Sequence, residues 1–351
     1  MTAESFAARL LAHYDRTRRP LPWRRPGVDA WTTWVCEVMS QQTRIEVVER
    51  RLPEFLERFP NPESFAGASD EDLHDAWQGL GYYRRARLLR QGATEVNEQF
   101  DGRIPADHAA LRGLSGIGDY TAAAIASIAF GLPQAAVDGN VERILARHGG
   151  VRDEVRKAAG RRQIRELAER HLDPNRPGDF NQALMDLGSS ICTPRNPNCA
   201  ACPIQRDCEA HRLELIDALP VLPARRESID VAACALLIEA EDGFVAARIP
   251  DGEVNAGQFE LPGPGVLVDQ PDDQDLLRAR IFERYGLEVR VGEELARVRH
   301  GITHHRITLR VHQAERLGPL PEGLSSMAPG DGAGTWSTPM RKIFKKLGVD
   351  H

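Results

Sequence analysis

The spacing of hydrophobic and polar residues divides the chain into two regions of different character. Before residue 212, apolar residues recur at the spacing of a helix face, and Pro, Gly and Asp residues separate the successive stretches. These stretches cover residues 31–50, 69–78, 84–99, 119–130, 139–148, 155–171 and 179–190. The pattern predicts a mostly α-helical domain over residues 1–211.

The pattern changes after residues 212–228, a segment that contains Pro220 and Pro223 and is predicted to be a linker. Beyond it, one helix pattern lies near residues 273–285, and short apolar runs predict strands. The predicted strands cover residues 231–239, 244–249, 289–291 and 307–311. We therefore expect a smaller α+β domain over residues 229–351.

Length and composition agree with this division. The chain has 351 residues, enough for two domains, and the composition of an ordinary soluble globular protein. No apolar run approaches the roughly 20 residues that span a bilayer. The N-terminal residues also lack the pattern of a secretory signal. We expect a cytoplasmic protein with no membrane partner.

The net charge of -6, taken alone, argues mildly against a nucleic-acid partner. However, residues 1–211 carry 28 basic and 29 acidic side chains, so most of the negative excess belongs to the second domain. Arginines also cluster within residues 9–25 and 84–90. Such clusters form either solvated faces or contacts to phosphates. The net charge therefore does not exclude DNA as a partner.

Four of the six cysteines lie within 17 residues, in the spacing C-x6-C-x2-C-x5-C. They are Cys192, Cys199, Cys202 and Cys208. Four thiols this close, in a chain without a predicted secretion signal, favour a metal centre over two disulfides. Zinc and iron–sulfur clusters both take four thiolates, so the spacing by itself leaves the metal open.

A short glycine-containing turn separates two helical stretches at residues 114–118. Gly116 and Gly118 allow a tight turn that exposes backbone N–H groups at the start of the next helix, an arrangement that suits a phosphate oxygen. An ordinary turn between two helices is the alternative interpretation.

Two carboxylates are candidates for catalysis. Asp138 precedes a helical stretch, where it is also a suitable N-cap. Glu37 lies on a polar stripe with Gln41 and Arg44, beside an apolar helix face. Desolvation there would raise the pKa of Glu37, as a general acid requires. The alternative for Glu37 is an ordinary helix carboxylate paired with Arg44 or water.

Three stretches together resemble the endonuclease III and MutY branch of DNA glycosylases. They are the cysteine spacing after the helix at residues 180–188, the hairpin at 114–118, and the helix segment C-E-V-M-S-Q-Q-T at 36–43. The matching positions extend over residues 20–208. The resemblance implies a [4Fe–4S] cluster, held by the four cysteines near DNA in a structural role. It also implies a helix-hairpin-helix glycosylase fold for residues 1–211.

The resemblance assigns roles to three residues. Glu37 would protonate N7 of adenine and later handle water, and Asp138 would stabilise positive charge at C1′ of the sugar. Tyr120 resembles the tyrosine that assists this aspartate. Bifunctional relatives carry a lysine at that position for Schiff-base chemistry, and Lys157 is the only lysine before Lys342. We therefore expect a monofunctional enzyme without strong AP lyase activity.

Further positions match the family individually. Trp23, Arg24 and Gln182 correspond to residues of the adenine pocket, and Ser40 stands where the family has a pocket leucine. DNA contacts are implied for the remaining matches, Gln42, Thr43, Leu80, Tyr82, Gly116 and Gly118. Gln42 and Tyr82 would enter the duplex, while Thr43 and Leu80 would neighbour the opposite base. Ser115 replaces the proline of the family's L-P-G-x-G hairpin.

Residues 229–351 resemble the Nudix-like domain of MutY-type glycosylases. The family's F-S-H loop, which recognises 8-oxoguanine, appears as Ile302, Thr303 and His304; the alternative is an ordinary β-turn. A Nudix hydrolase needs clustered carboxylates for Mg²⁺. Only Glu283 is retained at those positions, which otherwise hold Pro271, Arg280 and Arg284, so we expect no pyrophosphatase activity.

The sequence thus predicts a monomeric adenine DNA glycosylase of base excision repair, associated with the nucleoid. Its expected partner is double-stranded DNA with adenine opposite 8-oxoguanine or guanine, from which the target base must be flipped. Two alternatives remain: a glycosylase for mismatched thymine or uracil, and a non-catalytic DNA-binding relative. Retention of both Glu37 and Asp138 argues against the second.

Overall fold

The structure is a computed structural model, which describes residues 5–25, 27–224, 227–250, 252–329 and 336–349. Its contacts divide the chain into two compact units, Met1–Pro223 and Ala224–His351. Residues 225–226 of the predicted linker lie outside the described residues. Within the described residues, no helix is both long and apolar enough to span a bilayer.

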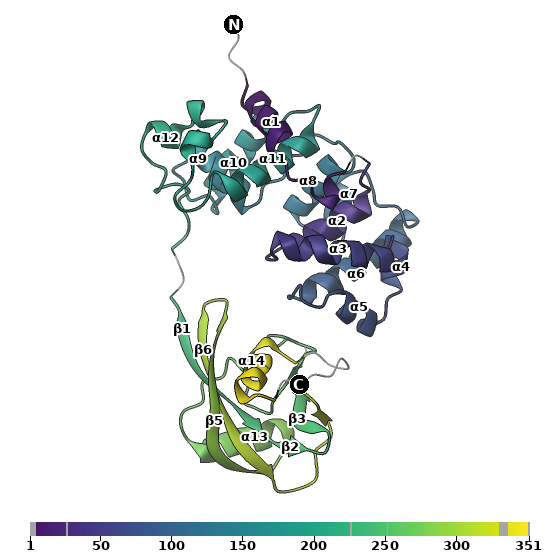
Figure 1. Cartoon of the computed structure of the whole chain (residues 1–351), viewed down its shortest axis with the longest axis vertical. Helices are drawn as coiled ribbons and strands as arrows, with labels where there is room; N and C mark the ends of the chain where they lie inside the picture. Colours follow the sequence, from purple (N-terminus) through teal and green to yellow (C-terminus); the bar gives the residue numbers. More distant parts are fainter. Residues whose placement is uncertain (1–4, 26, 225–226, 251, 330–335, 350–351) are drawn as a thin grey trace. The chain divides into compact units, whose positions relative to one another are not determined.

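The first unit is built from helices, as predicted (Figure 1). Short 3₁₀ turns lie at η1 (Pro22–Arg24), η2 (Cys199–Ala201) and η3 (Gln205–Asp207). The α-helices are α1 (Phe6–Thr17), α2 (Ala30–Ser40), α3 (Ile45–Arg58), α4 (Pro62–Ala66), α5 (Asp70–Ala76), α6 (Arg84–Phe100), α7 (His108–Gly113), α8 (Asp119–Ile128), α9 (Gly139–Gly149), α10 (Ala158–His171), α11 (Pro177–Ser190) and α12 (Glu209–Arg212).

Two hydrophobic cores hold this unit together. One gathers around α2, α3 and α6 and includes the fully buried Trp34 and Trp77. The other gathers around α1, α9 and α11 and includes Phe180. Helix α8 contacts both α2 and α11, so residues at its N-terminal end can meet groups from both cores.

The stretch at residues 31–50, continuous in its apolar pattern, is two helices in the structure. Helix α2 ends at Ser40 and α3 begins at Ile45. The C-cap Gln41 leaves the helical region with a ψ of 112°, and Gln42 follows with a positive φ of 57°, so the helix is interrupted here. The carbonyls left free at the end of α2 are bound by Arg85 of α6. A partner distant in sequence therefore decides this break.

The second unit is α+β, as predicted (Figure 1). Strand β1 (Ile229–Leu237) pairs in parallel with β6 (His305–Arg316), which pairs antiparallel with β5 (Val289–Ile302). A second sheet contains β2 (Glu239–Ala240), β3 (Gly243–Arg248), β4 (Phe259–Glu260) and β7 (Leu324–Met327). Helices α13 (Gln274–Tyr285) and α14 (Thr338–Leu347) complete the unit.

Alternate residues of β1 enter different cores. Ala233 and Ala235 pack in the cluster that contains Phe344 of α14, whereas Leu236 packs in the cluster that contains Ile281 of α13. The period of two along a strand requires this division. The predicted strands at 289–291 and 307–311 are parts of the longer β5 and β6, and the sequence pattern missed β7 and α14.

Candidate active site

A cavity of about 610 Å³ in the first unit contains most of the predicted site. Its walls come from η1 and the residues before it, α2, the turn after α2, both ends of α8, the start of α9 with its N-cap, and α11. The predicted residues that line it are Trp23, Arg24, Glu37, Ser40, Gln42, Thr43, Tyr120, Asp138 and Gln182. Leu80, Tyr82, Gly116 and Gly118 do not line it.

Glu37 lies near the end of α2, half-buried at the cavity wall. Its Oε2 accepts a hydrogen bond of 2.7 Å from the hydroxyl of Tyr120, so its partner is not Arg44. Burial raises the pKa of Glu37 to about 7; the charge of Asp138 also raises it, while Tyr120 and Arg24 lower it. A carboxyl with this pKa holds a proton that it can give up near neutral pH.

Tyr120 follows the hairpin, in the first turn of α8. Its hydroxyl donates a hydrogen bond to Glu37 and lies 3.7 Å from the Met185 sulfur. Burial raises the pKa of Tyr120 well above its usual value, and the charge of Glu37 adds to this, so the hydroxyl keeps its proton. The bond to Glu37 differs from the expected role beside Asp138, and assistance to Asp138 stays a prediction.

Asp138 is the N-cap of α9. Its Oδ1 accepts from the backbone N–H groups of Asn140 at 2.9 Å and Val141 at 2.8 Å. Its Oδ2 accepts from Asn140 Nδ2 at 3.0 Å. Three N–H donors suit an anionic carboxylate and fix its direction. The capping and catalytic interpretations are therefore compatible.

A buried arginine, Arg143, holds Asn140, the residue that donates to Asp138. Arg143 donates to Asn140 Oδ1 at 2.9 Å, to the Gly188 carbonyl at 2.9 Å and to the Cys192 carbonyl at 2.8 Å. Gly188 allows this close packing, because a Cβ there would lie 2.7 Å from the Asn140 Cβ. Sequence reasoning missed Arg143, since two of its three partners, Gly188 and Cys192, lie 45 and 49 residues away.

Arg24 forms the other charged wall of the cavity. Its Nη1 and Nη2 donate to the two oxygens of Asp186 at 2.6 and 3.0 Å, and Arg19 donates to the same carboxylate at 2.7 Å. Gln182 bonds the Gly178 carbonyl at 3.3 Å. Ser40, which the sequence analysis aligned with a leucine of the family, places a hydroxyl at the cavity wall. Its Oγ lies 3.9 Å from the Cys36 sulfur.

Two turns beside the cavity share one organising residue, Arg85. Its guanidinium donates to the carbonyls of Val38 and Gln41, both at 2.6 Å, and of Leu80 at 2.9 Å. It also contacts the Met39 and Gly81 carbonyls and the Thr43 hydroxyl. Arg85 therefore joins the turn that carries Gln42 to the turn that carries Tyr82. The sequence placed it only in an arginine cluster.

The residues on these turns differ in exposure. Gln42 and Tyr82 both have positive φ, 57° and 48°, and the Tyr82 side chain is 64% exposed. Such strained backbone in non-glycine residues often marks functional positions. Leu80 is only 4% exposed and packs in the first core. Its contact with DNA stays a prediction that the free protein does not display.

The hairpin has the predicted turn. Gly116 has φ of 79°, and Gly118 is the N-cap of α8. Ser115, at the position of the family's proline, is held by Glu95 of α6. The Glu95 carboxylate accepts from the Ser115 backbone N–H at 2.7 Å and from its hydroxyl at 2.6 Å. These two bonds replace the rigidity that a proline ring would supply.

The four clustered cysteines form no disulfide with one another and line one small pocket. Cys192 lies 3.5 Å from Nη1 of the buried Arg147, which also donates to the Thr193 and Pro194 carbonyls. Four cysteine sulfurs around one pocket, with a cation beside them, suit an iron–sulfur cluster. No group of three or more His, Cys, Asp or Glu in the described residues is arranged to hold a single metal ion.

In the second unit, Thr303 and His304 form the turn between β5 and β6. Thr303 has a positive φ of 52°, and its hydroxyl donates to the Ile302 carbonyl at 2.7 Å. His304 lies against His305, with ring centroids 4.2 Å apart.

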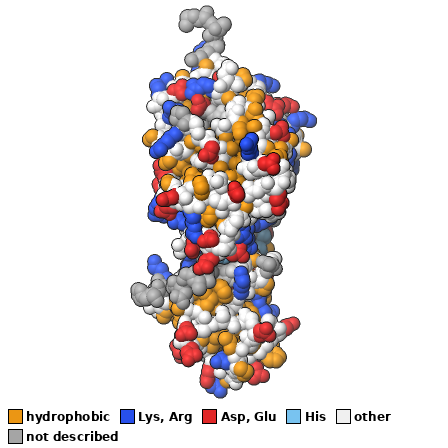
Figure 2. Space-filling model, turned by 90° about the vertical axis from the view of Figure 1, so that its right-hand side faces the viewer, with side chains coloured by type: hydrophobic (Ala, Val, Ile, Leu, Met, Phe, Trp, Pro, Cys, Tyr) orange, Lys and Arg blue, Asp and Glu red, His pale blue; other side chains and the backbone are white. Residues whose placement is uncertain are grey.

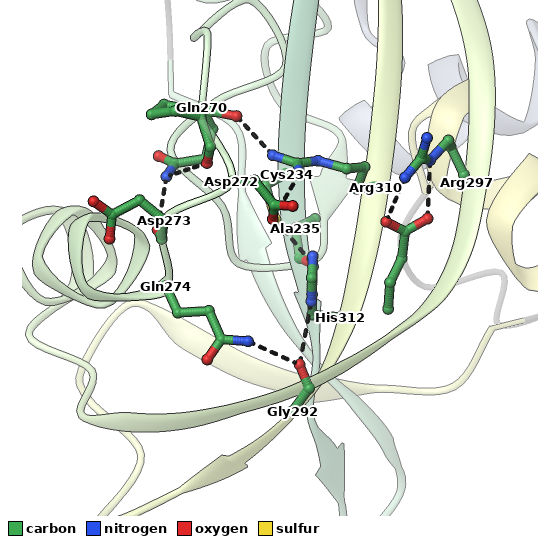
Figure 3. Close-up of polar contacts among 12 residues, drawn as sticks. Cys234, Ala235, Gln270, Asp272, Asp273, Gln274, Gly292, Arg297, Arg310 and His312 are labelled. Carbon is green, nitrogen blue, oxygen red and sulfur yellow. Dashed lines mark hydrogen bonds and ion pairs between the residues drawn. The ribbon is translucent and has the colours of Figure 1, made fainter.

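The arginines that the sequence analysis aligned with Nudix carboxylates bind groups of the same unit. Arg284 binds both oxygens of Glu253 at 3.0 and 2.9 Å, and Arg280 binds the Asp269 carbonyl and the Gln270 side chain. Nearby, Arg310 bonds the Gln270 carbonyl and pairs with Asp272 (Figure 3). These contacts give the arginines structural roles.

Comparison with known proteins identifies two family matches. Residues 35–170 match the HhH-GPD superfamily base excision DNA repair protein, and residues 192–208 match the iron–sulfur binding domain of endonuclease III. The second match covers all four clustered cysteines and, with the relatives below, confirms the predicted [4Fe–4S] cofactor. Cys192, Cys199, Cys202 and Cys208 are the residues available to hold it.

Solved structures share the helical fold. A thermostable thymine-DNA glycosylase aligns with a TM-score of 0.55 and 28% identity, over 59% of this chain and 95% of that chain. A non-covalent endonuclease III–DNA complex aligns with a TM-score of 0.51 and 21% identity, over 60% and 94%. The second comparison bears on the fold alone.

The most informative relatives are adenine DNA glycosylases. The Homo sapiens protein is 40% identical over 66% of this chain, a region that spans 44% of that relative. The Mycobacterium tuberculosis protein is 41% identical over 73% of this chain and 93% of its own length. The Rattus norvegicus protein is 40% identical over 97% of this chain and 77% of its own length. Because this similarity extends through both units, the chain belongs to the adenine DNA glycosylase family.

Proposed function

We propose that this protein is a monofunctional glycosylase that removes adenine paired with 8-oxoguanine, and with guanine, from double-stranded DNA. The observation that carries the proposal is the pair of carboxyl groups on one cavity. Glu37 has a pKa raised to about 7, and Asp138 is oriented by three N–H donors. Cleavage of a glycosidic bond needs this combination of an acid and a separate carboxylate.

The reaction would proceed on an adenine flipped into the cavity. Glu37 donates its proton to N7 as the bond from C1′ to the base breaks, so adenine leaves as a neutral base. The electron-poor sugar is stabilised by the Asp138 carboxylate. Water then adds its oxygen to C1′ and returns a proton to Glu37. The products are adenine and an abasic site, and the enzyme regains its starting state.

The residues beside the cavity would serve binding. Gln42 and Tyr82, on the turns joined by Arg85, would fill the space left by the flipped nucleotide, and the hairpin N–H groups would hold a phosphate. Thr303 and His304 would read 8-oxoguanine. The [4Fe–4S] cluster supplies structural rigidity, and no chemical step uses it. We propose that the protein works as a monomer.

Strand cleavage by a Schiff base is not part of the proposal. Tyr120 occupies the position of the lysine that bifunctional relatives use. Lys157, the only lysine before Lys342, is exposed and pairs with Glu154 at 3.1 Å, and it does not line the cavity. The proposed products therefore keep the DNA backbone intact.

Removal of mismatched thymine is the second candidate. The similarity to a thymine-DNA glycosylase structure favours it, and the small, polar Ser40 at the cavity wall is a departure from the adenine-specific pattern. The identity of about 40% to adenine DNA glycosylases favours adenine. Uracil is tested beside thymine because it fits the same space.

One panel of duplexes distinguishes these substrates. Each duplex carries A, T or U opposite 8-oxoguanine or G, and alkali after the reaction reveals abasic sites. We expect cleavage of the A strand, fastest opposite 8-oxoguanine. The proposal fails if the T or U strand is cleaved and the A strand is not. Nicking without alkali, together with borohydride trapping, would show lyase chemistry instead.

A further inference from the structure

The second unit contains a cavity of about 510 Å³ next to the turn of Thr303 and His304. It is lined by basic side chains from three elements: Arg299 and His300 of β5, Arg306 of β6 and Lys342 of α14. Gly301, Ile307 and Thr308 also line it, and Asp230 is the one acidic residue among the described residues of the lining.

The charges of this cavity are not balanced within the described residues. Asp230 accepts two hydrogen bonds from Arg306, at 2.7 and 2.6 Å, so one cation is neutralised. Among the residues that the structure describes, Lys342 hydrogen-bonds only the Arg299 carbonyl and His300 Nδ1, both at 3.3 Å. The Arg299 guanidinium has no hydrogen-bond or ion-pair partner in the described part of the chain. Two cations therefore face the cavity without a carboxylate.

The strand register leaves space for a ligand between the arginines. Gly301 pairs with Arg306, and Arg299 lies two residues before Gly301, so Arg299 and Arg306 are on the same face of the hairpin. Gly301 lies between them without a side chain. A Cβ at Gly301 would meet only the His305 carbonyl, at 4.0 Å. The gap is therefore open.

We propose that this cavity binds phosphate groups of the DNA strand that the Thr303–His304 turn reads. Unbalanced arginine and lysine side chains are the usual partners of phosphate oxygens. The cavity begins two residues before this turn, so DNA that reaches the turn brings its backbone to the same hairpin. The inference rests on the proposed function of the second unit. A free phosphate or nucleotide has the same chemistry and is the competing occupant.

Salt dependence of duplex binding gives the first test. Arg299→Gln and Lys342→Gln are measured in the full chain with the duplex kept intact by Glu37→Gln in every protein. Each variant should lose one phosphate contact, which reduces the slope of log Kd against log salt by roughly 0.9. Affinity should fall by the same factor for 8-oxoguanine and guanine duplexes, because phosphate contacts carry no base information.

Matched controls separate a phosphate contact from other effects. Arg278→Gln on α13 removes the same charge from an exposed residue outside the cavity and should leave the slope unchanged. Thr303→Ala should instead change the ratio of the two affinities. Gly301→Glu should weaken duplex binding more than Gly301→Gln, because only the first places a negative charge in the gap.

The outcomes decide the proposal. Unchanged slopes for both Arg299→Gln and Lys342→Gln would overturn it. So would duplex binding that stays normal while dATP or inorganic phosphate binds to the wild-type protein and not to the variants, since the cavity would then be a nucleotide or phosphate site. The proposed glycosylase function fails by a different result, the absence of excision by the wild-type protein.

Discussion

The hydroxyl of Tyr120 donates a 2.7 Å hydrogen bond to Glu37, a contact between residues 83 positions apart. It binds the carboxyl that is proposed to carry the catalytic proton. A donor to the ionised form lowers the pKa of Glu37, while burial raises it, and burial is the larger effect. The two residues together therefore set the pH range of the reaction.

The first prediction concerns Glu37 and pH. Excision needs the protonated acid, so single-turnover rates should fall as pH rises through about 7. Glu37→Gln should abolish excision and leave duplex binding within a few-fold. Loss of both binding and folding in this variant would show that Glu37 is structural.

Stability should show the same titration. A carboxyl whose pKa is raised by folding favours the folded state most at pH below its unfolded value, and this contribution is lost as pH rises through about 7. Glu37→Gln does not titrate. The variant should therefore gain stability relative to wild type between pH 5 and pH 8, as urea unfolding would measure. A constant difference would contradict the raised pKa.

Removal of the Tyr120 hydroxyl should shift the pH profile. Tyr120→Phe deletes the bond that lowers the pKa of Glu37, so the midpoint of the rate profile should move to higher pH. Loss of positioning should also reduce the maximal rate, by about 10-fold. A reduced rate with an unchanged midpoint would limit Tyr120 to packing in the cavity wall.

Glu95 should control DNA binding through the hairpin. Glu95→Ala removes both hydrogen bonds to Ser115, so we expect weaker duplex binding, by about 5–10-fold for roughly 1 kcal/mol lost. The single-turnover rate at saturation should change little. Ser115→Pro in the same chain should restore affinity, because a proline fixes φ without the carboxylate. Absence of this rescue would assign Glu95 a role outside the hairpin.

Arg85 should support both turns beside the cavity. Arg85→Met leaves the carbonyls of Val38, Gln41 and Leu80 without this donor, and we expect a loss of about 2–4 kcal/mol in the free energy of unfolding. Arg84→Met is the control, because Arg84 is exposed and carries the same charge. Equal effects of the two variants would mean that only net charge matters.

Several properties followed from the sequence alone. The helical period, the hairpin glycines and the cysteine spacing are local patterns, and they were enough to predict a helical unit, a phosphate-binding turn and a metal centre. The uneven distribution of charge between the two domains also matters, because it means that the net charge of -6 does not exclude DNA as a partner. Acidic and basic side chains are intermixed on the face of the molecule in Figure 2.

Other properties depended on folding. The break between α2 and α3 and the positions of Gln42 and Tyr82 depend on Arg85, which lies more than 40 residues from the end of α2. Glu95 compensates for the missing hairpin proline from 20 residues away. The sequence predicted candidate residues for the site because their types and order form local motifs. Only the tertiary structure decided their partners, because hydrogen bonds and burial arise between segments that are distant in the chain.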